Sequence, residues 1–224
     1  MKLSKETLAI FKNFSTINSN LTLKSGSKLT TLSIGKNIIA EATVAETFPS
    51  EFGIYDLNEF LGALSLFENP TLEFNEKYVI IKNEGSSSKT GVTYYAASSN
   101  VLTSVPVIKS FPEVDIEFKL PGTMLQQIQK VSSILRVSDF SFVGDGTDIL
   151  VQVGDKSNPT GNTYSAEIAN TDKIFRVNFK VENLKLMNGD YTVSIGGKKI
   201  SRFKSCYQDL TYLIAIELDS TFAF

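Results

Sequence analysis

The sequence has no His, no Trp and a single Cys, Cys206, among its 224 residues. His is the commonest general base at neutral pH, so its absence excludes Ser-His-Asp and Cys-His catalytic sites. A zinc site of His and Cys is excluded too, and a lone Cys forms no disulfide within the chain, which fits a reducing compartment. Carboxylate or lysine catalysis stays open, but the composition argues against an enzyme, and we predict no metal site and no cofactor.

Long apolar runs are also missing. The first residues lack the apolar segment of a signal peptide, and no stretch approaches the roughly 20 apolar residues that span a bilayer. We therefore expect a soluble cytoplasmic protein with no membrane partner. The formal net charge is −2, whereas a protein that grips DNA by contact usually carries a basic surplus. The chain either does not touch DNA or holds it by something other than net attraction.

The first of two predicted amphipathic helices runs from about residue 5 to residue 16, with Ser4 as its N-cap. At 100° per residue its apolar side, which includes Phe14, lies opposite Lys5 and Lys12. A solvated helix face would explain these lysines, but they are the sharpest functional candidates in the sequence.

The second helix is predicted from about residue 124 to residue 135, with Thr123 and Gln126 at the spacing of a capping box. Its apolar stripe consists of Met124, Leu125, Ile128, Val131 and Leu135. The opposite side carries Gln126, Gln127, Lys130 and Ser133.

A similar series of elements follows each helix. Two strands around a Gly turn are predicted at 21–35 and 140–154, the second with a strong Asp-Gly hairpin signal at Asp145-Gly146. Each series continues with a third strand (38–44 and 163–169) and a short helix (56–66, opened by a capping box of Asp56 and Glu59, and 182–187). Three more strands follow in each (71–74, 78–82 and 91–97; 190–195, 199–204 and 210–218). The repeat of about 120 residues indicates an internal duplication of one α+β unit.

Residues 98–112 connect the halves. Two prolines favour extended backbone, and the apolar content argues against a free, solvated linker. We expect a connector lying on the surface, between a first domain at 1–110 and a second at 111–224.

Several segments, taken in order, are similar to the sliding clamps of T-even-type phages over essentially the whole chain. The segments are 1–7, Leu-Lys-Ser-Gly at 23–26, Ile-Tyr-Asp-Leu-Asn at 54–58 with Phe-Leu-Gly at 60–62, Leu-Gln-Gln at 125–127 with Lys-Val-Ser at 130–132, and the ending at 218–224. The resemblance implies the DNA-clamp fold, which is α+β with two similar domains per chain. Three subunits then close a ring of six domains, with antiparallel sheets outside and helices lining the hole.

The resemblance also implies a function. Such a homotrimer encircles duplex DNA without sequence preference and tethers the replicative DNA polymerase for processive synthesis. An ATP-dependent clamp loader opens the ring, and late-transcription factors of the phage family also use it. The expected location is the cytoplasm of the infected bacterial host.

Two other classes compete with this interpretation. A β-rich structural or virion protein would trimerise without a DNA-sized hole. A carboxylate-based hydrolase would need two nearby carboxylates in a cleft, and no paired-acid motif is visible.

The charge distribution fits a ring. The predicted helix segments 1–16, 55–67, 121–136 and 180–188 sum to +3, so with a net charge of −2 the remainder holds −5. A mildly basic bore suits sliding, because many tight phosphate contacts would make binding strong, salt-sensitive and immobile. The predicted DNA-facing residues are Lys5, Lys12, Lys130 and Arg136, with Gln126 and Gln127 as neutral donors.

The resemblance places two further sites. The strand at 91–97 should pair with the strand at 163–169 of the next subunit, which puts Val92, Tyr94, Tyr95, Tyr164 and Ala166 at the subunit interface. Clamps generally bind a partner's apolar peptide beside the connector, which here predicts a pocket of Val105, Ile108, Phe111, Ile34, Ile38, Phe222 and Phe224. The two terminal aromatics have an alternative role, which is to pack onto the last sheet.

Overall fold

The computed structural model describes residues 1–85, 90–107, 110–158, 160–197 and 199–224, and ligands and other chains are not part of it. The chain divides into two compact units, Met1–Val107 (unit 1) and Ile108–Phe224 (unit 2). The predicted boundary at residue 110 lies beside this division. No helix among the described residues is long and apolar enough to cross a membrane.

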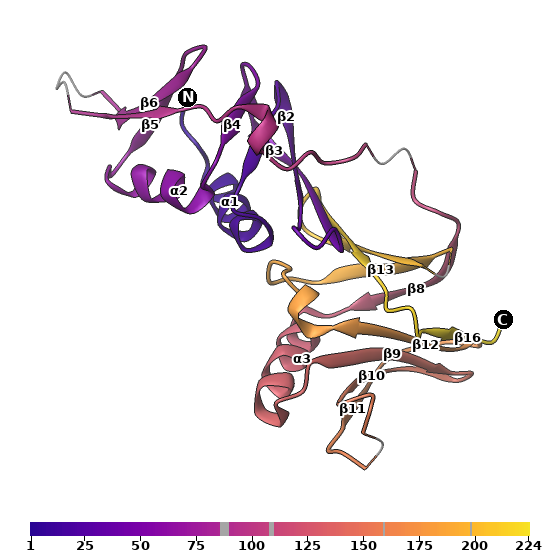
Figure 1. Cartoon of the computed structure of the whole chain (residues 1–224). Helices are drawn as coiled ribbons and strands as arrows, with labels where there is room; N and C mark the ends of the chain where they lie inside the picture. Colours follow the sequence, from indigo (N-terminus) through magenta and orange to yellow (C-terminus); the bar gives the residue numbers. More distant parts are fainter. Residues whose placement is uncertain (86–89, 108–109, 159, 198) are drawn as a thin grey trace. The chain divides into compact units, whose positions relative to one another are not determined.

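Unit 1 is built from two helices and short antiparallel strands. In chain order its elements are α1 (Lys5–Ile17), β1 (Leu21–Leu23), β2 (Gly26–Leu32), β3 (Ile38–Phe48), β4 (Phe52–Ile54), α2 (Leu57–Ser65), β5 (Pro70–Phe74), β6 (Tyr78–Asn83), β7 (Val92–Tyr95) and the 3-10 turn η1 (Ser99–Val101). β1 pairs with β4, β2 pairs with β3, and β5, β6 and β7 form a three-stranded sheet. Figure 1 shows α1 and α2 on the same side of these strands.

The helices of unit 1 begin at the predicted caps. The Ser4 side chain accepts a hydrogen bond from the backbone N–H of Thr7, and the Asp56 side chain caps the first turn of α2. The apolar side of α1 is buried, and Phe11 stacks against Phe48 of β3 at 6.4 Å between ring centroids. Both predicted helices of this unit are therefore confirmed.

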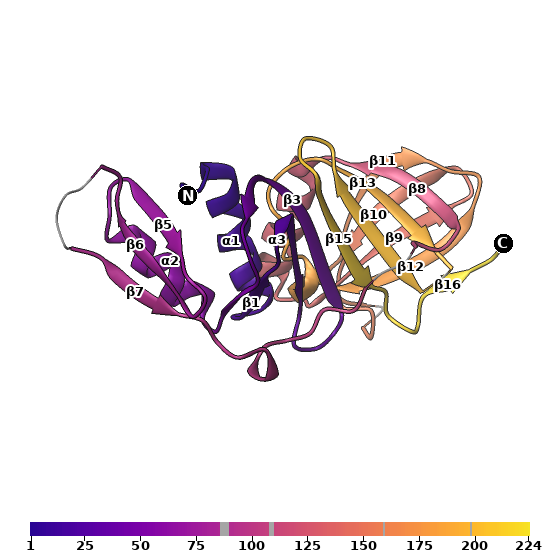
Figure 2. The ribbon, with the colours of Figure 1, turned by 90° about the horizontal axis from the view of Figure 1, so that it is seen from above.

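Unit 2 repeats the same order with one extra strand before it and one after it. Its elements are β8 (Val114–Leu120), α3 (Gly122–Leu135), β9 (Asp139–Asp145), β10 (Asp148–Val153), β11 (Tyr164–Asn170), β12 (Ile174–Lys180), η2 (Val181–Asn183), β13 (Tyr191–Gly196), β14 (Ile200–Ser205), β15 (Leu210–Ala215) and β16 (Thr221–Phe222). One sheet has the order β11-β10-β9-β12-β16, and β8, β13, β14 and β15 are neighbours in another. Both units thus run helix, four strands, short helical segment and three strands, which confirms the α+β fold of two similar domains. Figure 2 views these sheets from above.

Aromatic rings form much of the core of unit 2. Phe142 of β9 contacts Phe118 of β8 at 4.8 Å and Phe179 of β12 at 5.6 Å between centroids, and Phe203 of β14 also packs on Phe179. All four rings are buried. Because they come from both sheets, they hold the two layers together.

The predicted helix at 182–187 is wrong. The chain makes only the 3-10 turn η2 and then runs without regular structure. Leu184 and Leu186 are buried while the residues between and after them are less so, which is the alternation of an extended segment. Burial of these two side chains outweighs the weak local helix signal.

The connector lies along unit 1 at its start, as expected. Two side chains from the α1–β1 loop hold it: the Asn20 carboxamide oxygen accepts from Thr103 N–H at 2.9 Å, and the Asn18 amide donates to the Thr103 hydroxyl at 2.9 Å. Apart from η1, its described residues have no regular structure.

Candidate nucleic-acid interface

The exposed side of α1 carries two lysines without a carboxylate partner. Lys5 and Lys12 are exposed, opposite the buried Ile10 and Phe14. Within the part of the chain that the structure describes, no carboxylate lies within 4 Å of either ammonium group. By contrast, Lys28 on β2 pairs with Glu41 on β3 at 2.6 Å. The positive charges of α1 are therefore open to an external anion.

A carboxylate from the sheet fixes the start of α1. The two oxygens of Glu46, on β3, accept hydrogen bonds from the Ser4 backbone N–H and the Thr7 hydroxyl. Burial alone would raise the pKa of Glu46, but the Thr7 and Ser4 hydrogen bonds outweigh it and hold this pKa below its ordinary value. A negative charge here also suits the positive end of the helix dipole. Sequence patterns could not reveal this contact, since Glu46 lies 42 residues after Ser4.

Helix α3 presents a similar face in unit 2. Gln126 and Lys130 are exposed and Gln127 is half-buried, while Leu125 and Ile128 are fully buried on the opposite side. Lys130 has no ion-pair partner among the described residues. Periodicity alone was enough to predict which side of α3 faces outward.

Arg136 is the residue at which α3 ends. Its backbone is left-handed (φ 56°, ψ 43°), and its N–H donates to the Ser132 carbonyl, as does that of Val137 at 3.1 Å. Gly or Asn usually occupies this position because a Cβ is strained there. The guanidinium is exposed beyond the end of the helix and makes no ion pair within the described parts of the chain.

The predicted capping box of α3 is wrong. The helix begins at Gly122, and its first N–H donates at 2.8 Å to the carboxylate of Asp190, the residue before β13. The hydroxyl of Tyr207 donates to the other carboxylate oxygen. The hydrogen bond from Tyr207, and to a smaller extent the one from Gly122, lowers the pKa of Asp190. A Cβ at position 122 would come within 2.9 Å of the Gly189 backbone, so the close approach of these two backbone segments requires glycine at position 122.

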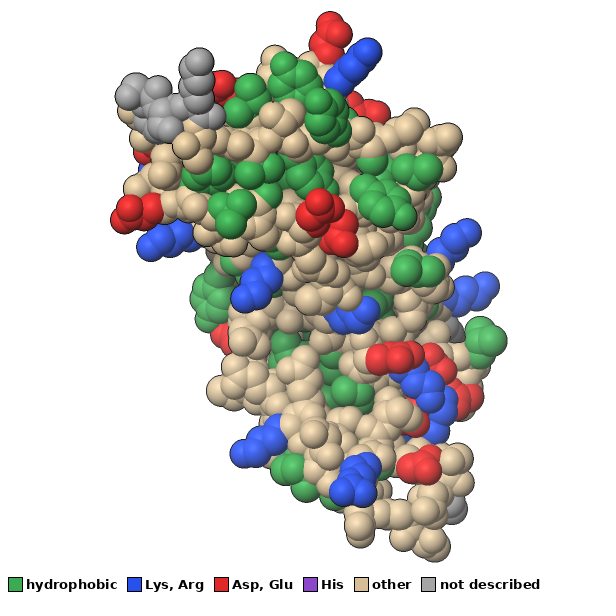
Figure 3. Space-filling view, turned by 60° about the vertical axis from the view of Figure 1, so that its left-hand side comes forward, with side chains coloured by type: hydrophobic (Ala, Val, Ile, Leu, Met, Phe, Trp, Pro, Cys, Tyr) green, Lys and Arg blue, Asp and Glu red, His purple; other side chains and the backbone are tan. Residues whose placement is uncertain are grey.

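On the face in Figure 3, the basic groups of the described residues do not form a dense patch. On the face in Figure 3, several Lys and Arg side chains stand apart, and where they crowd together Asp and Glu side chains lie among them. Strand and loop lysines are often paired, as in Lys82–Glu73 (2.6 Å) and Lys156–Asp219 (2.8 Å). The arrangement offers weak, separate contacts to a polyanion rather than a tight binding groove.

The two strands predicted to meet between subunits both lie at sheet edges. β7 pairs with β6 alone and β11 with β10 alone, within the residues that the structure describes. Each therefore has a row of backbone groups open to another strand. The opposite edge of the β7 sheet is partly closed, because Lys2 forms an antiparallel bridge with Thr71 of β5.

The predicted interface residues differ in their surroundings. Tyr94 is buried against Phe60 at 5.1 Å, and its hydroxyl donates to the Asp56 carbonyl at 3.1 Å, so it packs inside unit 1. Tyr95 points the other way and is 70% exposed. The half-buried members of the set are Val92, Tyr164 and Ala166.

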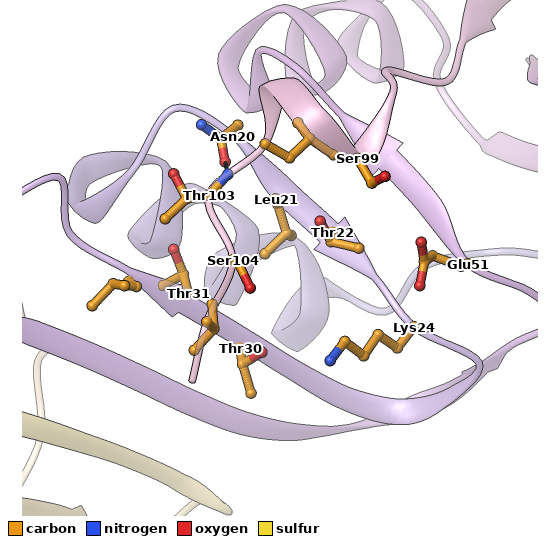
Figure 4. Close-up of a pocket in the computed structure, with 13 residues that line it drawn as sticks. Asn20, Leu21, Thr22, Lys24, Thr30, Thr31, Glu51, Ser99, Thr103 and Ser104 are labelled. Atoms are coloured by element: carbon orange, nitrogen blue, oxygen red, sulfur yellow. Dashed lines mark hydrogen bonds between the residues drawn. The ribbon is translucent and has the colours of Figure 1, made fainter. Parts of the chain in front are cut away.

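A cavity of about 230 Å³ lies beside the connector within unit 1. In Figure 4, Thr103 and Ser104 of the connector stand across from Thr30 and Thr31 of β2. Most residues that line the cavity carry hydroxyl, amide or charged groups. Its other lining residues are Asn20, Leu21, Thr22, Lys24, Leu32, Glu51, Ser99, Leu102 and Val105. Of the predicted pocket residues that the structure describes, Val105 alone contributes to this cavity.

The other predicted pocket residues have separate environments. In unit 1, Ile34 is 82% exposed in the β2–β3 turn and Ile38 is buried. In unit 2, Phe111 is half-buried beneath the Arg202 guanidinium, 4.4 Å from the ring centroid, and close to Gly196. Phe222 and Phe224 lie on the C-terminal segment, described below, and Ile108 lies outside the described residues.

Comparison with known proteins identifies the family. Residues 4–101 match the model of the DNA polymerase processivity factor, and residues 117–218 match that of the gp45 sliding clamp, C-terminal part. The sliding clamp of Vibrio phage KVP40 is 36% identical over 224 residues, covering 97% of this chain and 99% of the relative. The chain belongs to the sliding-clamp family. The sliding clamp of Escherichia phage RB69 is 28% identical and covers both chains completely.

Solved structures agree on the fold of this clamp. Thermococcus kodakaraensis PCNA superposes with a TM-score of 0.68 at 14% identity over 95% of this chain and 96% of that one. A. fulgidus PCNA bound to the C-terminal region of FEN-1 gives 0.70 at 12% identity over 98% of both chains. Because the sliding-clamp family is a non-catalytic scaffold, membership excludes the hydrolase and virion-protein alternatives.

Proposed function

We propose that three copies of this chain close into a ring around duplex DNA and tether the replicative DNA polymerase to it. The observation that supports this most is the set of exposed cations on α1 and α3 that have no ion-pair partner among the described residues, in a protein whose net charge is −2. Lys5, Lys12, Lys130 and Arg136 would face the phosphates, with Gln126 and Gln127 as neutral donors.

The mechanism separates retention from binding. Each exposed lysine–phosphate contact is worth about 1 kcal/mol or less, and few contacts release few counterions, so none holds the ring in place. Because these contacts are to phosphates and not to bases, they do not depend on the DNA sequence, and the ring can slide. Retention then comes from topology, because a closed ring cannot leave a circular duplex.

Closure of the ring needs a head-to-tail contact, for which the β7 and β11 edges are suited. Antiparallel pairing of β7 with β11 of the next copy would satisfy both rows of open backbone groups. Val92, Tyr95, Tyr164 and Ala166 would then lie at the seam. Tyr94 would support β7 from inside unit 1 by its contacts with Phe60 and Asp56.

The remaining partners follow from the family. A clamp loader that itself binds ATP would open the ring, and late-transcription factors would use the loaded clamp, all in the cytoplasm of the infected host. The polymerase would dock by a C-terminal peptide beside the connector. The complex of A. fulgidus PCNA with the C-terminal region of FEN-1 supports docking by a C-terminal peptide for the fold.

The particle mass tests the ring. Sedimentation equilibrium at micromolar concentration should give three times the 24.7 kDa chain mass. Tyr95→Lys should shift the mass toward the monomer, while Ile34→Lys, a change at another exposed residue, in a turn, should not. A wild-type monomer or dimer at this concentration would contradict the proposal.

A further inference from the structure

The last residues of the chain lie along the edge of β12. Phe222 and Thr221 of β16 pair antiparallel with Phe175 and Arg176, and the Ala223 N–H continues the ladder to the Ile174 carbonyl at 3.0 Å. Figures 1 and 2 both show β16 beside β12 near the C-terminus. The C-terminal segment thus fills a sheet edge that would otherwise be open.

Asn178 and Lys156 fasten the start of this segment. The Asn178 backbone N–H donates to the Ser220 hydroxyl at 3.0 Å, and its side-chain amide donates to the Asp219 carboxylate at 3.1 Å. Lys156 pairs with the same carboxylate at 2.8 Å and is 3.7 Å from Glu217. Lys156 first, and then Asn178, lower the pKa of Asp219, so the carboxylate stays charged at neutral pH.

Beyond this anchor the attachment is slight. The paired strand has only two residues, and Leu218 in the preceding turn is fully exposed. Phe222 stands opposite Phe175, on the core side of the sheet, with its ring 5.9 Å from that of Phe224. Phe224 lies under the Lys173 ammonium, 4.7 Å from the ring centroid, and remains 43% exposed.

We propose that this segment is a displaceable strand. It occupies the edge of β12 to which an extended peptide of a partner would bind. The peptide would add to β12 by backbone hydrogen bonds, and two aromatic side chains at positions i and i+2 would replace Phe222 and Phe224. Backbone pairing supplies attraction, whereas Phe175 and Lys173 select aromatic residues of that spacing. The proposal rests on the proposed function only in taking the polymerase C-terminal peptide as the natural occupant.

The test uses the full-length chain and its own tail sequence. A fluorescent peptide of residues 219–224 is titrated against wild type and against Phe222→Ala/Phe224→Ala, in which the edge is less firmly covered. We expect the double variant to bind the peptide at least tenfold tighter than wild type. Bound peptide should slow amide exchange at 174–178. A control peptide with both Phe replaced by Ala should not bind.

A second variant guards against misfolding of the first. Asp219→Ala keeps both aromatics but removes the carboxylate contacts with Lys156 and the Asn178 side chain, so it should also bind the peptide more tightly than wild type. If either variant keeps the wild-type thermal transition and yet binds the peptide no better than wild type does, the displaceable strand is overturned.

A polymerase C-terminal peptide then separates the two proposals. If it competes with the tail peptide on the variants, the displaceable strand and the tether both hold, and the polymerase peptide docks at the β12 edge instead of beside the connector. Tail-peptide binding without competition would uphold the displaceable strand and remove the polymerase from this edge. Polymerase-peptide binding that is equal in wild type and variants, together with tail-peptide binding that the variants do not tighten, would uphold docking and overturn the strand.

Discussion

The Asp190 carboxylate holds the first backbone N–H of α3, that of Gly122, at 2.8 Å. Unit 1 contains the equivalent arrangement, in which Glu46 of β3 holds the Ser4 N–H at the start of α1. In each unit a carboxylate on a strand or directly before one therefore fixes the N-terminus of the helix that carries the candidate DNA-facing residues. These contacts set how the exposed cations are presented.

Glu46→Gln should destabilise unit 1 and change its acid response. Loss of the charged acceptor should cost about 1 kcal/mol at pH 7 after allowance for solvent screening. The folded pKa of Glu46 is depressed, so its contribution is complete above the ordinary value of 4.5 and is lost as pH falls through the lowered folded value. Urea unfolding from pH 7 to pH 3 should show a shallower loss of stability in the variant. Parallel pH curves would contradict this role.

Asp190→Ala should loosen the start of α3 without unfolding the chain. Amide exchange in the first turn, residues 122–125, should become about fivefold faster, as expected when a helix loses its cap. Asp209→Ala, which removes an exposed carboxylate of a neighbouring turn, is the control. Equal exchange in the two variants would show that Asp190 does not cap the helix.

Arg136→Gly should separate stability from function. Glycine adopts the left-handed conformation without strain, so the free energy of unfolding should rise by up to about 1 kcal/mol. Loss of the guanidinium should nevertheless lower loading on DNA. A variant that is both more stable and fully active would remove Arg136 from the DNA-facing set.

Lys12→Glu combined with Lys130→Glu should shorten polymerase runs, most strongly at high salt, where the remaining contacts are screened further. Lys36→Glu combined with Lys204→Glu makes the same change in net charge on exposed residues outside the helices. Run lengths from a primed template, measured over a salt series, should fall for the first pair and stay near wild type for the second. Equal effects would show that net charge, and not position, matters.

Local signals predicted much of the fold. The Ser4 and Asp56 caps located α1 and α2, and Asp145-Gly146 located the β9–β10 hairpin with Gly146 at φ 92°. Helical periodicity also predicted that Lys12 and Lys130 face outward. Such features depend on neighbours within a few residues, which is why one sequence reveals them.

Long-range contacts could not be predicted in this way. The Asp190–Gly122 contact joins residues 68 apart, and the contact of Arg202 with Phe111 has no local signature. Alternation along β7 shows that adjacent tyrosines face opposite sides but not which one is inside, and the structure buries Tyr94. Short edge strands such as β16 also escape notice, because pairing with β12 defines them.

Retention on DNA before and after linearisation tests the central claim most directly. The chain would be loaded with its clamp loader and ATP onto a nicked circular plasmid, separated from free protein by gel filtration, and then exposed to a single-cutting restriction enzyme. A ring that holds DNA by topology should stay with the circle for many minutes and be lost soon after the cut. Equal release from circular and linear DNA would contradict the account.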